Sequence, residues 1–245
     1  MVKSVEVCVN SFESAVAAQK GGADRVELCS VLPVGGVTPS YGMIRCCKDY
    51  LEGVDINVLI RPRSGDFCYN RYEIDEIRRD IEFCGELGLN GVVIGALTPD
   101  GNVDMKLCAE LIDLARKYAL SVTFHRAIDR AADIYRALDD VIELGADRIL
   151  TSGGAVSAPD GCETLRNMVI QAAGRINIMA GAGIRPDNVG YLVQKTGVPE
   201  VHLSATVSRE SQMRVVTGPD FGKDQVVTVT DTEVVRCVVN EVKNV

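Results

Sequence analysis

The chain contains only two histidines, and both occur in short apolar runs that are typical of buried strands. His125 ends the run "SVTFH", and His202 lies within "EVHLSA"; Glu27 lies in a third such run, "RVELC". Imidazole titrates near neutral pH and suits proton transfer, so Glu27 and His125 are candidates for an acid and a base, with His202 in support. A hydrogen-bonded core histidine is the alternative, and the second histidine in a matching position brings the two interpretations level.

Two of the nine cysteines, Cys8 and Cys29, lie near the C-terminal ends of the first two apolar runs. Neighbouring parallel strands are about 4.8 Å apart, so these sulfurs could share one soft ion. Two thiolates suit Cu(I). Two packed core cysteines are the alternative, which the residues alone favour. The chain has no C-x-x-C pair, which argues against zinc-knuckle and thioredoxin-like sites.

Basic residues and glycines suggest a site for an anion. Arg61 and Arg63 flank a proline at the end of a run, and a planar guanidinium suits a carboxylate or a phosphate. Arg61 could instead neutralise Glu27 on the neighbouring strand. Two glycine-rich turns, "TSGGA" and "AGAGIRPDN", could direct backbone N–H groups at an anion, or could simply be tight turns. The candidates for anion binding are Arg61, Arg63, Ser204, Gly153, Gly154, Gly181 and Gly183.

Eight short β-branched runs alternate with helical patterns along the chain. The helical segment 71–88 has Ile74, Ile77 and Ile81 at helical spacing. Repeated strand–helix units predict a parallel sheet, and eight units are the number that closes a (β/α)8 TIM barrel. An open doubly wound sheet is the alternative, but G-x-G-x-x-G is absent after the first run. The expected strands are 5–9, 25–29, 56–62, 91–96, 121–125, 148–152, 176–181 and 200–205.

A weak internal repeat supports a closed barrel. The sequence "AVAAQKGGADRVELCS" (15–30) resembles "ALDDVIELGADRILTS" (137–152), and the offset between Asp24 and Asp147 is close to half the chain. A barrel built from two similar halves would show this offset. The alternative is that helix, Gly, Asp, strand is a common way to connect a helix to a strand.

Strand alternation predicts which side chains face the barrel interior. If Val5, Val7 and Val9 and their counterparts pack against the helices, the intervening polar residues point inward. Burying so many ionisable groups costs several kcal/mol each unless they are paired or solvated, so we expect a polar pocket at the C-terminal mouth of the barrel. The expected inward set is Glu6, Cys8, Asn10, Glu27, Cys29, Leu59, Arg61, Arg63, Thr123, His125, His202 and Ser204.

Composition excludes several classes of protein. The formal net charge of -8 argues against nucleic acid as a partner. The start of the chain lacks the apolar region of a signal peptide, and no stretch is long and apolar enough to span a membrane. Cysteines within apolar segments, such as Cys84, Cys108 and Cys237, are expected to be reduced and buried in a cytoplasmic protein. We expect a single domain over residues 1–245, because no linker interrupts the chain.

Several motifs, taken in order, resemble those of the CutC copper-homeostasis family. They are "EVCV" (6–9), "GGADRVELCS" (21–30), "GGVTPS" (35–40), "IRPRSGDFCY" (60–69), "TFHRAID" (123–129), "ILTSGG" (149–154), "AGAGI" (180–184) and "HLSA" (202–205). The resemblance implies a cytoplasmic (β/α)8 barrel that forms a homo-oligomer, a dimer or a tetramer, and binds copper as Cu(I) through Cys8 and Cys29. Ala182 stands where the family more often has a glycine.

Two functional hypotheses follow. The first is Cu(I) binding through thiols near the ends of the first two strands. The second is an enzyme acting on a small phosphorylated or carboxylated substrate, with Glu27 and His125 as acid and base, His202 in support, and the arginines as anchors. Two features leave further alternatives open: the helices could serve a non-catalytic oligomeric scaffold, and the polar connection 206–231 could be a lid or a subunit contact.

Overall fold

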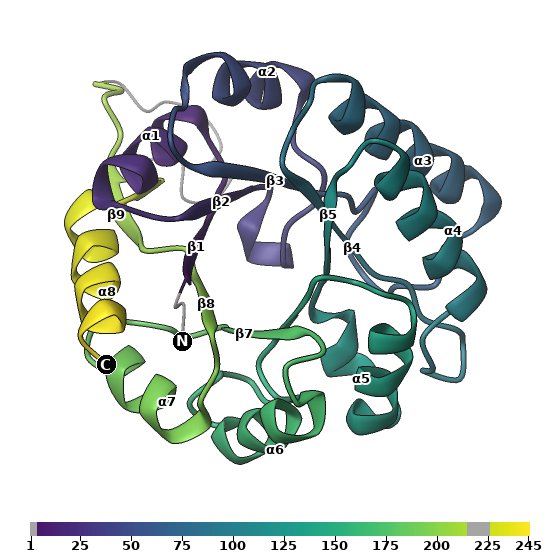
Figure 1. Cartoon of the computed structure of the whole chain (residues 1–245). Helices are drawn as coiled ribbons and strands as arrows, with labels where there is room; N and C mark the ends of the chain where they lie inside the picture. Colours follow the sequence, from purple (N-terminus) through teal and green to yellow (C-terminus); the bar gives the residue numbers. More distant parts are fainter. Residues whose placement is uncertain (1–3, 215–225) are drawn as a thin grey trace.

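The computed structural model describes residues 4–214 and 226–245 of the 245-residue chain. Eight parallel strands pair in sequence order, and β8 returns to β1, which closes a barrel (Figure 1). The TIM-barrel prediction is therefore confirmed, and the open-sheet alternative is wrong because β1 has a partner on both sides. The strands are β1 (Ser4–Val9), β2 (Arg25–Leu28), β3 (Asp55–Leu59), β4 (Gly91–Ile94), β5 (Ser121–Phe124), β6 (Arg148–Thr151), β7 (Asn177–Gly181) and β8 (Glu200–Leu203).

Helices surround the barrel on the outside, as Figure 1 shows. The helix expected at 71–88 is α3, which begins with a capping box between Asn70 and Glu73 that satisfies the first free backbone N–H groups. Two short 3-10 helices follow strand ends: η1 (Leu32–Val34) and η2 (Arg126–Arg130). The α-helices are α1 (Phe12–Gly21), α2 (Tyr41–Tyr50), α3 (Arg71–Glu86), α4 (Met105–Lys117), α5 (Ile134–Glu143), α6 (Cys162–Ala172), α7 (Val189–Thr196) and α8 (Thr232–Asn244).

The core is divided as strand alternation predicts. Val5, Val7 and Val9 belong to the large apolar layer between strands and helices, whereas Cys8 and Cys29 belong to a small separate cluster inside the barrel. One expectation about cysteines is wrong: Cys237 is exposed. It lies on α8, whose buried face is formed by valines instead.

The two copies of the internal repeat occupy equivalent places in the barrel. Asp24 precedes β2 and accepts a hydrogen bond from the Val5 N–H of β1 at 2.9 Å. Asp147 precedes β6 and accepts one from the Val122 N–H of β5 at 2.7 Å. Each aspartate therefore links its strand pair in the same way, β1 with β2 and β5 with β6. A barrel of two similar halves is expected to show this equivalence.

The expected connection 206–231 contains an antiparallel hairpin of β9 (Thr206–Glu210) and β10 (Val226–Thr230). Residues 215–225, between these strands, lie outside the described residues. Arg209 of β9 forms an ion pair with Glu13 of α1 at 2.5 Å. Across residues 4–214 and 226–245, every helix is too short or too polar to cross a membrane.

Candidate functional site

A cavity of about 1660 Å³ opens at the C-terminal ends of the strands. It brings together most of the side chains expected there, and Val226, Val227 and Thr228 of β10 also line it. Arg63, Gly153, Gly154 and Gly181 are not part of its wall. The predicted site residues that line the cavity are Cys8, Glu27, Cys29, Arg61, His125, Gly183, His202 and Ser204.

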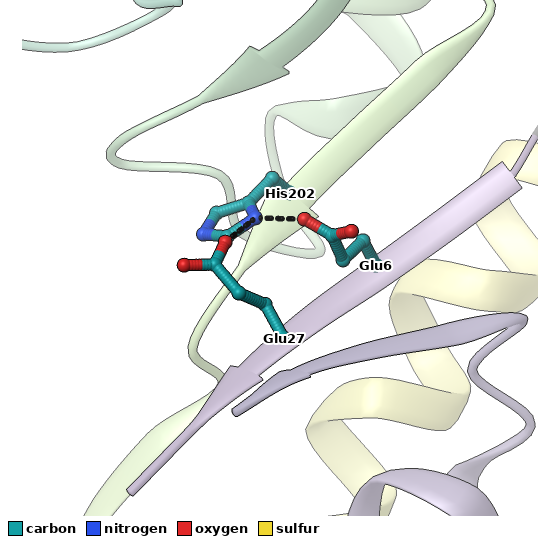
Figure 2. A group of neighbouring side chains, drawn as sticks. All are labelled: Glu6, Glu27 and His202. Atoms are coloured by element: carbon teal, nitrogen blue, oxygen red, sulfur yellow. Dashed lines mark hydrogen bonds and ion pairs between the residues drawn. The ribbon is translucent and has the colours of Figure 1, made fainter. Parts of the chain in front are cut away.

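Three ionisable side chains from adjacent strands meet at the base of this cavity, where Glu27 and His202 line its wall and Glu6 is buried behind them. Figure 2 shows His202 of β8 between Glu6 of β1 and Glu27 of β2. The His202 Nδ1 lies 2.7 Å from Glu6 Oε1 and 3.6 Å from Glu27 Oε2. The three strands are neighbours in the closed barrel, so the cluster exists only because β8 pairs with β1.

The three groups shift one another's protonation. Burial opposes the charged form of His202, but the Cys8 thiol and the carboxylates of Glu6 and Glu27 raise its pKa well above the usual value. Burial also opposes the charge on Glu6, yet Arg25 and His202 lower its pKa to about 2. Burial raises the pKa of Glu27 to about 7, despite the positive charge of His202. The cluster thus holds a charged imidazole beside a carboxyl group that titrates near neutrality.

Three further charged residues extend this cluster, and the sequence did not predict them as part of the site: Arg25, Arg148 and Glu200. Arg25 Nε lies 2.5 Å from Glu6 Oε2, and another nitrogen of Arg25 binds Glu200. Arg148 Nε lies 3.3 Å from the same Glu200 oxygen. Two features of the sequence could have indicated these residues. Arg25 is two residues before Glu27 and so faces the barrel interior with it, and Arg148 ends the second Gly-Ala-Asp-Arg sequence.

Glu6, Glu27 and His202 also have the geometry of possible metal ligands, since their ligand atoms lie within 4.8 Å of one another. However, Arg25 already neutralises Glu6, and metal binding requires the imidazole in its neutral form. A dication would have to displace the His202 proton next to a buried guanidinium. We therefore assign this cluster as an ion network.

Cys8 and Cys29 pack together with Leu59 and Val93 on the cavity wall. Burial, followed by the proximity of Cys8 and Glu27, raises the pKa of Cys29 far above its usual value. The Cys29 Sγ lies 3.5 Å from the Val9 carbonyl oxygen. Both thiols are free, and two soft sulfur donors side by side fit a low-coordinate soft ion.

The two predicted anion anchors have other partners. Arg61 makes no ion pair with Glu27: its terminal nitrogens donate to the carbonyls of Val34, Gly36 and Gly65 at 2.9–3.0 Å. It therefore clamps the loops that follow β2 and β3. Arg63 is outside the cavity and donates to Glu73 at 2.6 Å, as well as to Asp66 at 3.0 Å.

The glycine-rich turn after β6 already contains an anion that belongs to the chain. The Asp129 carboxylate accepts hydrogen bonds from the Ser152 N–H at 3.1 Å, the Gly154 N–H at 3.0 Å and the Thr151 hydroxyl at 2.5 Å. Gly153 instead donates to the Thr151 hydroxyl at 2.8 Å. This turn is consequently filled by Asp129 and is closed to a ligand phosphate.

The turn after β7 is different. Gly183 lines the cavity, whereas Gly181 lies within β7 against Leu150. Ala182, between them, has a φ of 76°, in the left-handed region that favours glycine. Ala182, which stands where the related sequences more often have glycine, is thus in a strained backbone conformation.

His125 lies in the cavity wall away from the ion network. Its Nδ1 accepts a hydrogen bond from the Ala127 N–H at 3.2 Å and so caps η2. Its ring packs against Phe67 with centroids 4.9 Å apart, and a Cβ at Gly95 would lie 2.6 Å from the imidazole. Burial and then Arg61 lower the pKa of His125 to about 3, so it is neutral at physiological pH.

The barrel and its cavity define the class of this chain: a (β/α)8-barrel protein with a polar site at the C-terminal mouth. Residues 3–207 match the model of the CutC family. The chain is 48% identical over 216 residues to a CutC family protein of Vibrio campbellii, covering 88% of this chain and 87% of the relative. It is 44% identical to a CutC family protein of Vibrio vulnificus, with both chains covered completely. The chain belongs to the CutC family.

Solved structures agree. The putative copper homeostasis protein CutC from Streptococcus agalactiae superposes with a TM-score of 0.78 at 33% identity, covering 83% of this chain and 99% of its own. Phosphoribosyl anthranilate isomerase from Thermotoga maritima superposes with a TM-score of 0.59 at 16% identity over the whole of both chains. This second likeness concerns the fold alone.

Proposed function

We propose that this protein binds Cu(I) in the cytosol through the thiolates of Cys8 and Cys29. The observation that carries the proposal is that the two free thiols lie in one small apolar cluster on the wall of the cavity. Cu(I) prefers sulfur ligands at low coordination number. The Streptococcus agalactiae relative is described as a putative copper homeostasis protein, which agrees with this proposal.

The surrounding charges support the same ion. Cys29 must lose a proton to bind copper, and its raised pKa means that the ion has to supply the driving force. A Cu(I) ion with two thiolates has a net negative charge. The charged imidazole of His202, next to Cys8, compensates this charge within the buried site.

Competition with a Cu(I) chelator tests the proposal. Reduced protein should withdraw one equivalent of Cu(I) from bicinchoninic acid, and Cys29→Ser should lose at least about tenfold in affinity. Cys237→Ser is the matched control because Cys237 is an exposed thiol on α8. Equal affinities for wild type, Cys29→Ser and Cys237→Ser would contradict the proposal.

A second function is favoured by a different observation. The cavity is far larger than one ion needs, and Glu27 Oε2 is buried in its wall with no hydrogen-bond partner among the described residues. We propose, as the second candidate, an enzyme that acts on a small anionic substrate in contact with Glu27. At the rim, Arg130 and Arg185 line the cavity and form no ion pair within residues 4–214 and 226–245, so they are the available anchors.

Ligand-induced stabilisation tests this second function. Phosphorylated and carboxylated metabolites should raise the Tm of the wild type, and Arg185→Gln should reduce the rise. Arg166→Gln, on the outer surface between α6 and α7, is the control and should leave the rise unchanged. If no such compound stabilises the protein, the second function is wrong.

A further inference from the structure

Four polar side chains of the cavity wall have a buried atom without a hydrogen-bond partner among the described residues. Two of these atoms can only accept, Asn10 Oδ1 and Glu27 Oε2 when ionised, and the other two are Arg61 Nε and His125 Nε2. Arg61 and His125 are each only 5% exposed. Within the described part of the chain, Glu27 Oε2 has only the ion pair with His202 at 3.6 Å. Buried polar atoms in proteins almost always have hydrogen-bond partners, so a group of atoms without them around one cavity indicates a polar ligand.

The hydrogen bond at one nitrogen of His125 determines what the other nitrogen does. Nδ1 accepts from the Ala127 N–H, so Nδ1 cannot hold the proton of the neutral ring. That proton must be on Nε2. Because burial and Arg61 also disfavour the charged ring, Nε2 is a hydrogen-bond donor throughout the neutral range and never a base.

Arg61 is held in one orientation, and one of its three nitrogens has no hydrogen-bond partner among the described residues. Three of the four N–H groups on its terminal nitrogens donate to loop carbonyls, and Nε is the one guanidinium nitrogen that makes no hydrogen bond among the described residues. Its guanidinium carbon lies 4.9 Å from the centroid of the Phe67 ring, and the His125 ring lies 4.9 Å from the same centroid. Both donor groups therefore pack against the same aromatic ring.

We infer that His125 Nε2–H and Arg61 Nε–H are a fixed pair of donors for the oxygens of one small ligand that has a carbonyl or carboxylate group. This inference rests on the second proposed function and deepens it, because it names the substrate class and the groups that bind it. Buried donors held in place by the protein stabilise negative charge on a bound oxygen. His125 is thus a binding group for an electron-rich oxygen, in place of the proton carrier expected from the sequence.

Two variants separate the two roles of His125, the cap of η2 by Nδ1 and the hydrogen-bond donor at Nε2. His125→Asn keeps an acceptor near the position of Nδ1 and so retains the bond from Ala127, but it has no group at the position of Nε2. His125→Gln extends an N–H donor to about the position of Nε2 and loses the cap. In ¹⁵N NMR of the wild type, we expect His125 to show an unprotonated Nδ1 and a protonated Nε2 from pH 5 to 8. A proton on Nδ1 would overturn the inference.

Ligand binding is measured with two named probes, pyruvate and 2-phosphoglycolate, by following the Nε2 resonance and by calorimetry. We expect His125→Asn to weaken binding of at least one probe by tenfold or more, and His125→Gln to weaken it by no more than about threefold. If inorganic phosphate shifts the Nε2 resonance as strongly as these probes do, the donors do not select a carbonyl or carboxylate group, and that part of the inference is wrong.

The remaining outcomes count against the inference. If neither probe shifts the Nε2 resonance, the donors bind ordered water only and the inference fails. The inference also fails if wild type and His125→Asn bind each probe with equal affinity. The second function fails separately, when no anionic metabolite stabilises the protein, and Cu(I) binding should be unchanged in His125→Asn because the thiols lie elsewhere on the wall.

Discussion

Arg25 and Arg148 bind the same carboxylate oxygen of Glu200 inside the barrel. Each follows the aspartate of one Gly-Ala-Asp-Arg sequence, so the repeat supplies both cations at the same height of the barrel. Arg25 also binds Glu6, which itself contacts His202. The floor of the cavity is therefore a connected set of buried charges.

Removal of Arg25 should be strongly destabilising. Arg25→Met leaves Glu6 without its guanidinium partner and Glu200 with Arg148 alone, and unpaired buried charges cost about 3–5 kcal/mol. Urea unfolding should show this loss in the free energy of unfolding. Arg209→Gln, which removes an exposed pair with Glu13, should cost at most about 1 kcal/mol. A similar loss in both variants would contradict the assigned network.

Two helical glycines should respond to alanine in opposite directions. A Cβ at Gly21 would lie 2.5 Å from the Val235 Cβ, so Gly21→Ala forces α1 away from α8 and should destabilise the protein by about 1–3 kcal/mol. Gly42, in α2, has open space around it, and Gly42→Ala should stabilise the protein by about 0.5–1 kcal/mol. Thermal unfolding of both variants checks the signs, and destabilisation by Gly42→Ala would refute the packing argument.

The sequence predicted the barrel and the inward phase of its polar side chains, because both depend on periodicity. It did not predict which charged groups pair. Alternation gives the direction of a side chain, but the partners of Arg61 and Arg63 depend on the paths of the loops after β2 and β3. Arg25 and Glu200 begin β2 and β8, at the opposite end from the mouth where barrel proteins have their sites, so the rule that predicts the site does not include them. The role of His125 depends on a single backbone hydrogen bond to Ala127, which no periodicity reveals.

Asp129 should be important for stability even though it resembles a loop residue. Its carboxylate accepts hydrogen bonds from the turn after β6 and from Arg126 at 2.7 Å. Asp129→Ala leaves several donors unpaired, and we expect a loss of about 2–4 kcal/mol by urea unfolding. Asp133→Ala, which removes the exposed N-cap of α5, should cost only about 1 kcal/mol. The reverse order of the two losses would show that the turn is held by other contacts.

His125 should make the protein sensitive to acid. Its pKa is lowered to about 3 in the folded protein, against about 6.5 in the unfolded chain. The contribution of the neutral His125 to the free energy of unfolding is therefore complete above pH 6.5 and is lost as the pH falls toward 3. At pH 5 this loss of stability is about 2 kcal/mol. The effect of His202 on stability has the opposite pH dependence. Because its pKa is raised in the folded protein, its contribution is complete below pH 6.5 and is lost as the pH rises through the raised pKa.

His125→Asn isolates the first of these effects. Between pH 7.5 and pH 5, its free energy of unfolding should fall less than that of the wild type by about 2 kcal/mol. Urea unfolding at each pH provides the measurement. Parallel pH profiles for the two proteins would mean that His125 takes up a proton in the folded state as easily as in the unfolded chain.

The ion network on the cavity floor also bears on how the chain folds. Its members come from β1, β2, β6 and β8, so the first and last strands of the barrel must both be in place before the charges are satisfied. An intermediate that lacks β8 would bury Arg25 and Glu6 without Glu200 and His202, at a cost that raises its free energy. Partly closed barrels should therefore be scarcely populated, and ring closure should make the unfolding transition cooperative.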